Sequence, residues 1–368
     1  MVYDNSILPP KADKAIYQHK IHDDIRLDPY YWLKDRDNPE VIDYLEREND
    51  YYQKMTADQE EFKDDLFQEL KARIKEDDSS VPYFYNGYWY ITRFEKNKQY
   101  PIYARKKDSL TATEEILFDC NIMAKNHKYF RLVGLNVSPD NTKIAYGVDT
   151  QSRRKYTLFI KNLMTQERLE TKIENTTGGS TWASDSEHLF YVHKNPNTLR
   201  SEAIYRHNIL TPNQENYLVY FEKDKTFSTH VSSSKSRDYI FISSHSTLSS
   251  EYQYIKASEP QAEFKLVQER IRKLEYYVSH YKDEFYMLTN QNGADNFELV
   301  KVPIKTSDQT NWEVIIPHRE DVLLEDIEIF KDYYVLTERS EGLIKLRIIK
   351  WDGTSDYYIP IDGETYSL

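Results

Sequence analysis

The chain has 368 residues, 39% of them hydrophobic and 30% charged, which suits a folded protein with a polar surface. This length exceeds the usual size of one domain and predicts two structural units or one large repeat array. Aromatic residues reach 14%, which argues against disorder. The formal charge is −12 and the basic residues are scattered along the chain. A nucleic-acid-binding groove needs clustered Lys and Arg, so this function is excluded. Solubility alone accounts for such an acidic surface, although it would also attract cationic ligands.

Neither a secretory leader nor a membrane span is visible. The start, Met1–Pro10, lacks a basic region and an apolar core, and no run approaches the roughly 18 apolar residues of a span. The single cysteine, Cys120, cannot form an internal disulfide, which fits a reducing compartment. We therefore expect a cytoplasmic protein that binds neither nucleic acid nor a membrane.

An extended arm is predicted at Pro9–Asp37, before any helix. It is punctuated by proline and holds an aromatic cluster formed by Tyr30, Tyr31 and Trp32. Such an arm is expected to pack on another part of the protein.

Two helices are predicted between residues 37 and 76. Asp37 or Asn38 is suited to cap the first helix, with Pro39 in its first turn. The second helix carries an apolar stripe opposite a charged face. The members of this stripe are Phe62, Leu66, Phe67, Leu70 and Ile74. Core packing is the favoured interpretation, and docking on a partner chain is the alternative.

After Pro82 the pattern changes to short alternating strands, separated by turns rich in Asn, Asp, Ser and Gly. The chain has 32 tyrosines and nine glycines. Because tyrosine favours strands and needs one wet end, this ratio favours many half-exposed strands. A hairpin is predicted at Asn86-Gly87, since this dipeptide readily takes the positive φ values of a tight turn.

One unit recurs along the rest of the chain, and its strand-like cores start about 45 to 55 residues apart. The six cores are Tyr88–Ile91, Lys143–Tyr146, His188–Val192, Asp238–Ile242, Glu284–Leu288 and Tyr333–Leu336. The strands predicted to follow the later cores are Tyr156–Asn162, Ala203–Asn208, Tyr252–Lys256, Phe297–Val302 and Leu343–Ile349. This spacing is typical of propeller blades with four short strands each.

The sequence thus predicts a mainly β fold. Residues 81–368 form an incomplete β-propeller with six visible blades, and residues 1–80 form an N-terminal arm and helices. A string of separate β-sandwich modules is the alternative, disfavoured because no linker rich in Pro, Gly or Ser interrupts the array. The end at Tyr366-Ser367-Leu368 resembles the start of another strand, so we expect a truncated chain.

No complete catalytic motif is found. A serine hydrolase of the α/β type needs its nucleophile within Gly-x-Ser-x-Gly or a close variant. The nearest match, Gly178-Gly179-Ser180, has no closing glycine and is interpreted as a turn between blades. Neither a Walker loop nor a dinucleotide fingerprint occurs. His19 and His22 form the closest histidine pair, but no third ligand is near, so no metal or cofactor is predicted.

A basic cluster, Ser152-Arg153-Arg154-Lys155, interrupts the acidic chain between two strands of one blade. It is interpreted either as a solvated hairpin tip or as a substrate-access site. In the second case Arg153 or Arg154 binds a peptide carboxylate through two parallel hydrogen bonds.

The segment Ser138-Pro139-Asp140 and its echo Ala183-Ser184-Asp185 predict two β-turns before inner strands. In such turns proline presets φ and aspartate binds the following backbone. Both segments are therefore assigned a structural role.

The arm Asp28-Pro29-Tyr30-Tyr31-Trp32-Leu33-Lys34-Asp35 closely resembles the D-x-Y-x-W-L-x-D signature of the prolyl oligopeptidase family of serine peptidases. Glu46-x-Glu48-Asn49 is similar to the first-helix motif of that family. Other segments resemble its oligopeptidase B (protease II) branch: Ser138–Thr142, Ser152–Arg154, Lys161–Leu163, Trp182–Ser186, Tyr205–His207, Pro317–Glu320 and Ile361–Tyr366. The resemblance runs the length of the chain.

This resemblance implies a seven-bladed propeller capping an α/β-hydrolase domain, on which the arm and helices pack. It places the catalytic Ser, Asp and His beyond Leu368, with most of the acidic residues that select Arg or Lys before the cleaved bond. The complete protein would be a serine-type endopeptidase whose propeller admits short peptides only, and this chain alone would be inactive. Its expected partners are short peptides and its own C-terminal hydrolase domain.

Two other functions stay open. A free-standing propeller that binds peptides or proteins would lack a Gly-x-Ser-x-Gly-Gly segment in the downstream reading frame. A sugar- or cofactor-using propeller enzyme would need a metal cluster, and none is visible in the sequence. Left alone, the chain is expected to self-associate through its aromatic arm and open blade edges.

Overall fold

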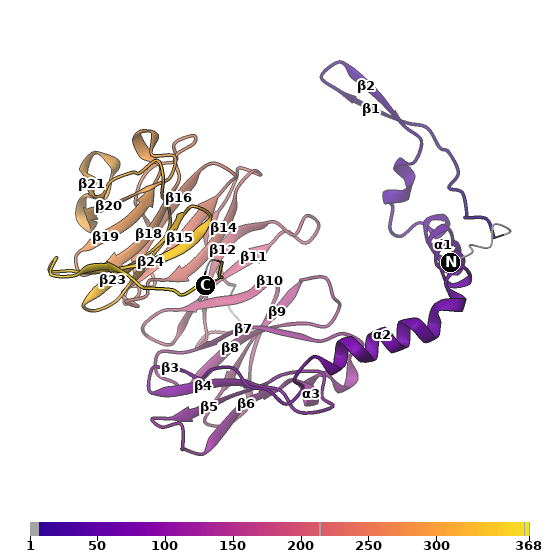
Figure 1. Cartoon of the computed structure of the whole chain (residues 1–368), viewed down its shortest axis with the longest axis horizontal. Coiled ribbons are helices and arrows are strands. Elements are labelled where there is room, and N and C mark those ends of the chain that lie inside the picture. The colour runs from indigo at the N-terminus through magenta and orange to yellow at the C-terminus, as the bar shows by residue number, and fades with distance from the viewer. Residues whose placement is uncertain (1–6, 213–214, 364, 368) are drawn as a thin grey trace. The chain divides into compact units, whose positions relative to one another are not determined.

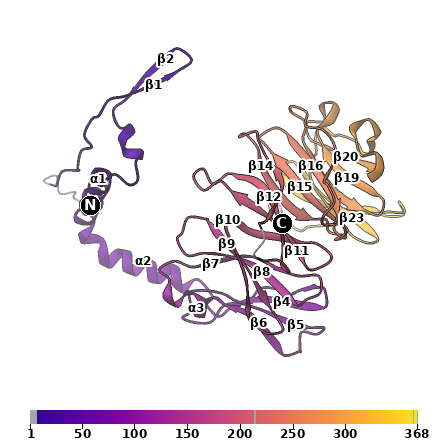
Figure 2. The same cartoon turned by 180° about the vertical axis from the view of Figure 1, so that it is seen from behind.

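The computed structural model describes residues 7–212, 215–363 and 365–367 and divides the chain into two compact units. The first unit runs to Asp78 and includes Glu95–Asn97. The second unit holds Ser79–Phe94 and the chain from Lys98 onward. Figures 1 and 2 show a hairpin and two long helices in the first unit and a succession of small sheets in the second.

An antiparallel hairpin, which the sequence analysis missed, opens the first unit. Strands β1 (Tyr17–Ile21) and β2 (Asp24–Asp28) pair through a turn at His22 and Asp23, both of which have positive φ. The turn dipeptide His22-Asp23 is none of the pairs that announce most two-residue hairpins, such as Asn-Gly, Asp-Gly or Gly-Gly. Beyond it the 3-10 helix η1 (Tyr31–Lys34) places Tyr31 on the ring of Tyr17, with 4.0 Å between centroids.

The two predicted helices are confirmed. Helix α1 spans Pro39–Met55 and α2 spans Glu60–Ala72, with the 3-10 turn η2 (Ala57–Gln59) between them. Asn38 caps α1, because its Oδ1 accepts a hydrogen bond from the Glu40 amide at 2.9 Å. Within the described residues no helix combines the length and the apolar character needed to cross a bilayer.

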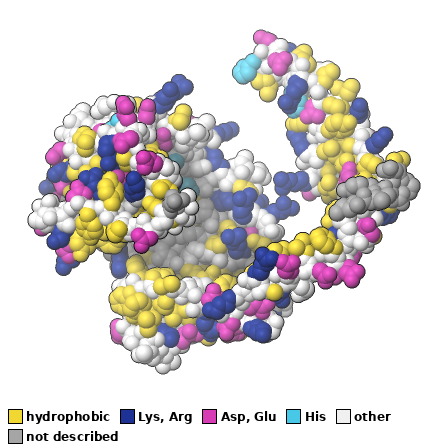
Figure 3. Space-filling model, viewed as in Figure 1, with side chains coloured by type: hydrophobic (Ala, Val, Ile, Leu, Met, Phe, Trp, Pro, Cys, Tyr) yellow, Lys and Arg dark blue, Asp and Glu magenta, His cyan; other side chains and the backbone are white. Residues whose placement is uncertain are grey.

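The prediction that the apolar stripe of α2 forms a core is wrong for the described chain. Phe62 is 63% exposed and Ile74 is 68% exposed, and α2 has no buried residue. Figure 3 shows hydrophobic side chains gathered along this helix. Helical periodicity indicates an amphipathic helix, but it does not say what covers the apolar face. Packing of residues 1–80 on a hydrolase domain stays a prediction.

Among the described residues, the second unit forms six antiparallel four-stranded groups, here called blades 1 to 6. Blade 1 contains β3 (Tyr83–Tyr85), β4 (Tyr88–Arg93), β5 (Ile102–Lys107) and β6 (Glu114–Asp119). Blade 2 contains β7 (Arg131–Val137), β8 (Lys143–Asp149), β9 (Tyr156–Asn162) and the start of β10 (Arg168–Trp182). Blade 3 contains the end of β10, β11 (His188–Lys194), β12 (Ser201–Asn208) and β13 (Tyr217–Phe221).

Blade 4 contains β14 (Ser228–Ser233), β15 (Tyr239–His245), β16 (Ser250–Lys256) and β17 (Lys265–Leu266). Blade 5 contains β18 (Tyr276–Tyr281), β19 (Glu284–Thr289), β20 (Glu298–Pro303) and β21 (Glu313–Ile316). Blade 6 contains β22 (Leu323–Ile329), β23 (Tyr333–Ser340), β24 (Leu343–Lys350) and β25 (Asp356–Tyr358). Short helices lie between strands: α3 (Cys120–Met123), η3 (Ala124–Asn126), η4 (Gln291–Gly293), η5 (Ile304–Thr306) and η6 (Gln309–Asn311). Each predicted core is the second strand of its blade, and each predicted following strand is the third, so the repeat is confirmed.

The two ends of the chain are described in part. Tyr366 and Ser367, expected to begin another strand, lie in no strand, and Leu368 is outside the described residues. Of the segment Met1–Pro10, where no leader is expected, residues 1–6 lie outside the described residues.

The core of the second unit consists of side chains packed between neighbouring blades. Alternate residues of β15 show the principle, because successive side chains of a strand point to opposite faces. Ile240 and Ile242 pack with Phe190 of blade 3, whereas Phe241 packs with Phe285 of blade 5. All five side chains are at most 2% exposed. Blade 4 is therefore stabilised from both sides by its neighbours.

The first strands of the blades face a common axis. Ser232 of β14, Ser279 of β18 and Glu328 of β22 come from three successive blades and line one cavity of about 210 Å3. A second cavity, of about 250 Å3, lies between blades 1 and 2 and is lined by residues of several strands, among them Tyr83, Tyr103 and Leu135. The meeting of first strands at the first cavity is the arrangement of a propeller channel.

The predicted turns are confirmed at three positions. Asn86 and Gly87 have φ of 49° and 84° in the tight turn between β3 and β4. Asp140 accepts a hydrogen bond from the Thr142 amide at 3.0 Å before β8. Asp185 makes the corresponding bonds to the backbone before β11.

The prediction that Gly178-Gly179-Ser180 forms a turn is wrong, because these residues lie inside β10. This strand runs from blade 2 into blade 3, with a register shift before Ser180. A Cβ on Gly134 would fall 2.1 Å from the carbonyl oxygen of Gly178, and one on Gly147 would fall 2.3 Å from its Cα. The glycines therefore permit strands to approach closely, and no nucleophile turn exists here.

Substitution at Gly178 and Gly179 tests this account. At Gly178, φ is +86° and a new Cβ would fall 2.4 Å from the Val133 side chain, whereas at Gly179 nothing lies within 4 Å. We expect Gly178→Ala to lower the free energy of unfolding by about 1–3 kcal/mol. The control Gly179→Ala should change it by less than about 0.5 kcal/mol. Urea unfolding measures both, and equal effects would contradict the close-approach argument.

Candidate functional site

The second unit has two distinct ends, because antiparallel strands place successive loops at alternate ends. We call one end the linker mouth, defined by loops 150–155 and 195–200 and linkers 222–227 and 267–275. We call the other the turn mouth, defined by turns 138–142, 183–187 and 234–238. The predicted access residues Arg153 and Arg154 lie at the linker mouth, between β8 and β9.

A buried carboxylate fixes the backbone that carries these two arginines. Asp149 is 1% exposed, and its Oδ2 accepts hydrogen bonds from the amides of Arg153 at 3.0 Å and Arg154 at 2.7 Å. Its Oδ1 accepts a third from the amide of Gln151 at 2.8 Å. The Arg154 carbonyl accepts a bond from Lys194 Nζ of blade 3 at 2.9 Å. The loop is therefore held by its backbone.

The side chains of Arg153 and Arg154 remain exposed, and neither forms an ion pair within the described part of the chain. Burial, and after it the positive charge of Arg154, lowers the pKa of Lys194. A guanidinium held on a fixed backbone is well suited to bind a carboxylate from solution. The role in substrate access stays a prediction.

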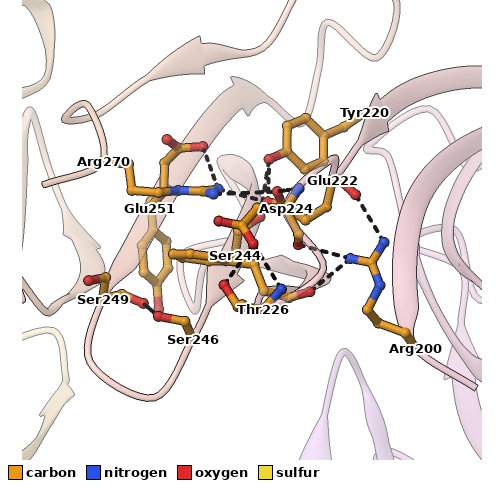
Figure 4. A network of polar contacts seen from close by, with 12 residues as sticks. Arg200, Tyr220, Glu222, Asp224, Thr226, Ser244, Ser246, Ser249, Glu251 and Arg270 are labelled. Carbon is orange, nitrogen blue, oxygen red and sulfur yellow. Dashed lines mark hydrogen bonds and ion pairs between the residues drawn. The ribbon is translucent and has the colours of Figure 1, made fainter. Parts of the chain in front are cut away.

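A second polar network at the linker mouth joins blades 3, 4 and 5. Its centre is Glu222, which is 3% exposed. Arg270 Nη2 and Tyr220 Oη donate to Glu222 Oε2 at 2.7 and 2.8 Å, and the Asp224 amide donates to Oε1 at 2.9 Å. Figure 4 shows Arg270 and Arg200 approaching this segment from opposite sides.

Arg200 binds the same linker through its backbone. Its guanidinium donates to the carbonyl oxygens of Glu222, Asp224 and Phe227 at 3.1, 3.2 and 2.9 Å. It also pairs with Glu202 at 3.0 Å. Both Nη atoms of Arg200 are thus occupied by hydrogen bonds within the protein. This arginine therefore stabilises the linker and is not available to bind a ligand carboxylate through two parallel hydrogen bonds.

The charge state of Glu222 is set by two opposing effects. Burial alone would raise the pKa of Glu222, but hydrogen bonds from Arg270 and Tyr220 outweigh burial and lower it below the ordinary value of 4.5. A carboxylate with a lowered pKa stays ionised at neutral pH and is a poor proton carrier. The network is therefore a structural element.

Ser236, His280 and Asp238 meet at the turn mouth, but they do not form a catalytic triad. Ser236 Oγ lies 2.7 Å from His280 Nδ1, and Asp238 lies 3.8 Å from the same nitrogen. The other ring nitrogen, Nε2, is bonded to the Lys282 carbonyl at 2.5 Å. A triad needs the serine and the aspartate on opposite nitrogens. This cluster cannot activate the serine.

The remaining candidate residues have structural partners. His19 lies 3.5 Å from Asp28 and contacts the rings of Tyr17 and Tyr31. No group of three His, Cys, Asp or Glu side chains suited to a metal occurs in the described ranges. Burial raises the pKa of Cys120 to about 12, so this thiol is unreactive.

The sequence analysis missed the Glu222 network because its members are far apart in the chain. Arg270 follows Glu222 by 48 residues, and no local motif marks either residue. The only usable signal is position, since both residues lie in segments that join one blade to the next.

The Glu222–Arg270 pair gives a pH-dependent prediction. Since the folded pKa of Glu222 is lowered, its stabilisation is present above 4.5 and is lost as the pH falls through the folded pKa. We expect Glu222→Gln to cost about 1–3 kcal/mol at pH 7. The deficit should shrink below pH 4.5. The exposed Glu263→Gln is the control, and a deficit that is constant with pH would refute the assignment.

The chain matches the model of the "Prolyl oligopeptidase, N-terminal beta-propeller domain" over residues 9–365. It is 38% identical to dipeptidyl aminopeptidase BI of Pseudoxanthomonas mexicana, an alignment covering 99% of this chain and 52% of that protein. It is 32% identical to protease 2 of Moraxella lacunata, covering 92% and 50%. The chain thus spans about half the length of these curated relatives.

Solved structures agree with this match. Oligopeptidase B from Leishmania major has a TM-score of 0.90 and 28% identity, with 97% of this chain and 54% of that chain covered. Oligopeptidase B from Trypanosoma brucei has a TM-score of 0.87 and 27% identity, with 95% and 52% covered. The order of the blades, the channel and these matches lead to one conclusion: the chain belongs to the prolyl oligopeptidase family and corresponds to its N-terminal β-propeller domain.

Proposed function

We propose that this chain is the N-terminal and propeller part of a serine oligopeptidase that cleaves short peptides after Arg or Lys. The family match over residues 9–365, together with coverage of about half of the relatives, carries this proposal. A C-terminal α/β-hydrolase domain would supply the missing chemistry. We place the complete protein in the cytoplasm, which the single buried Cys120 supports.

The chemistry of the complete protein would be acyl transfer. A serine of the hydrolase domain attacks the peptide carbonyl, a histidine moves the proton, an aspartate orients the histidine, and backbone amides bind the oxyanion. The propeller would restrict access, because its channel and mouths admit short peptides and exclude folded proteins. Acidic residues selecting Arg or Lys would lie mainly in the hydrolase domain.

A free-standing propeller that binds peptides or proteins without catalysis is the second candidate. The exposed cations of the Arg153 loop favour it as well, because they need no hydrolase to bind a carboxylate. The two candidates differ in the coding sequence downstream of Leu368, since a Gly-x-Ser-x-Gly-Gly segment there belongs to the peptidase alone.

Peptide hydrolysis separates these candidates. We expect the purified 368-residue chain to show no turnover of an Arg-linked fluorogenic peptide, and the protein extended downstream to cleave it. A matched peptide with Glu in place of Arg should be a poor substrate of the extended protein. Turnover by the purified chain alone, surviving repeated purification, would show that the nucleophile has been placed wrongly.

The access role of the basic loop has its own test in the extended protein. We expect Arg153→Ala combined with Arg154→Ala to reduce kcat/KM about tenfold for peptides with a free carboxylate, because a charge-assisted hydrogen bond is lost. Peptides with an amidated C-terminus and no acidic side chain should be unaffected. The control Lys128→Ala removes an exposed cation from another linker. Equal losses on both peptide types would contradict carboxylate binding.

A further inference from the structure

The turn between β14 and β15, residues 234–238, contacts blades that are not its neighbours. We call it the blade-4 turn. In the fold, blade 4 packs against blade 3 on one side and blade 5 on the other. A contact from this turn to blade 6 must therefore pass over the end of blade 5, and a contact to blade 1 must cross the propeller axis.

Two cations of the blade-4 turn make such contacts. The guanidinium carbon of Arg237 lies 4.2 Å from the ring centroid of Tyr85, at the end of the first strand of blade 1. Lys235 Nζ forms an ion pair with Glu328 in the first strand of blade 6. The same Nζ lies 3.8 Å from the ring centroid of Phe330, directly after that strand. One turn thus touches both terminal blades of the described array.

The centre of the turn is anchored next to these contacts. Ser236 Oγ is bonded to Nδ1 of His280 in blade 5 at 2.7 Å, and His280 is 5% exposed. The cavity of about 210 Å3 at the channel end is lined by Lys235, Glu328 and the first strands of blades 4 to 6. The two cations therefore project from a fixed base at the edge of the channel.

Arg237 occupies the position of the turn at which the backbone has positive φ. The turns of blades 2, 3 and 4 share one geometry, with a hydrogen bond across the turn and a residue at positive φ. That residue is Asn141 at 61°, Ser186 at 59° and Arg237 at 67°. Left-handed φ is tolerated by asparagine better than by a long side chain. Arg237 therefore takes a conformation that asparagine adopts at lower cost, as does Lys282 at 55° in the turn between β18 and β19.

We infer that the blade-4 turn is a latch that crosses the axis, joins blade 1 to blade 6 and closes the turn mouth of the channel. Each contact is of a weak class, an exposed ion pair or a cation–π contact, so the latch holds by summation and can open. With the turn mouth closed, peptides would reach the channel through the linker mouth. This consequence for peptides rests on the proposed function, whereas the latch itself does not.

Cross-linking tests the geometry of the latch without any activity. Cysteines at Tyr85→Cys and Arg237→Cys should be joined within one chain by a short bis-maleimide. The control pair Tyr85→Cys and Glu259→Cys uses an exposed loop of the same blade at the same end. We expect the latch pair to react on the order of tenfold faster than the control, because proximity raises the effective concentration. Buried Cys120 contributes no background.

Hydrogen exchange tests the role of the cation. We expect Arg237→Asn, which suits the turn but removes the cation, to speed exchange several-fold in the hairpin β3–β4 of blade 1, whose strands pair from Tyr83 to Tyr85. Arg237→Lys keeps the charge and should exchange like the native chain. If the latch pair reacts no faster than the control, or if Arg237→Asn leaves this hairpin unchanged, the latch is refuted. Both readouts are independent of peptidase activity.

Discussion

The fold depends on the burial of apolar side chains between neighbouring blades. A single sheet such as β14 to β17 has two apolar faces and cannot bury either by itself, since Ile240 and Phe241 point in opposite directions. Burying a large apolar side chain contributes about 1.5–3 kcal/mol, and such pairs recur at every blade junction. The channel, both mouths and the positions of the loops all follow from this requirement, because stacked blades must turn about an axis.

Buried carboxylates bring order to the linker mouth. Asp149 and Glu222 are both almost fully buried, yet they act on different partners. Asp149 accepts three backbone amides and leaves the neighbouring guanidinium groups exposed. Glu222 instead accepts hydrogen bonds from a guanidinium and a tyrosine hydroxyl, which engages Arg270 in an ion pair. Arginines at one mouth thus serve two purposes, and the partner of the nearby carboxylate decides which.

Sequence patterns predicted the elements of this structure better than its long-range contacts. The repeat and the turns at Asn86 and Asp140 were predictable because they depend on local periodicity and local φ preference. The hairpin at His22 was missed because its turn is not one of the usual dipeptides such as Asn-Gly, and the α2 stripe was misassigned because amphipathicity does not identify a partner. The Glu222–Arg270 pair joins distant linkers, so no local pattern encodes it.

Strand β10 gives the ring unequal mechanical properties. Blades 2 and 3 share this continuous strand, whereas blades 3, 4 and 5 are joined by irregular linkers such as 222–227 and 267–275. A linker can rotate about its backbone dihedrals, whereas Thr176 of β10 pairs with Tyr156 of blade 2 and with His193 of blade 3 and so ties the two blades together. We therefore expect blades 2 and 3 to move as one unit, with relative motion between blades falling on the other junctions. Arg154 and Lys194 both lie on this unit, so we expect the hydrogen bond between them to persist when the other junctions move.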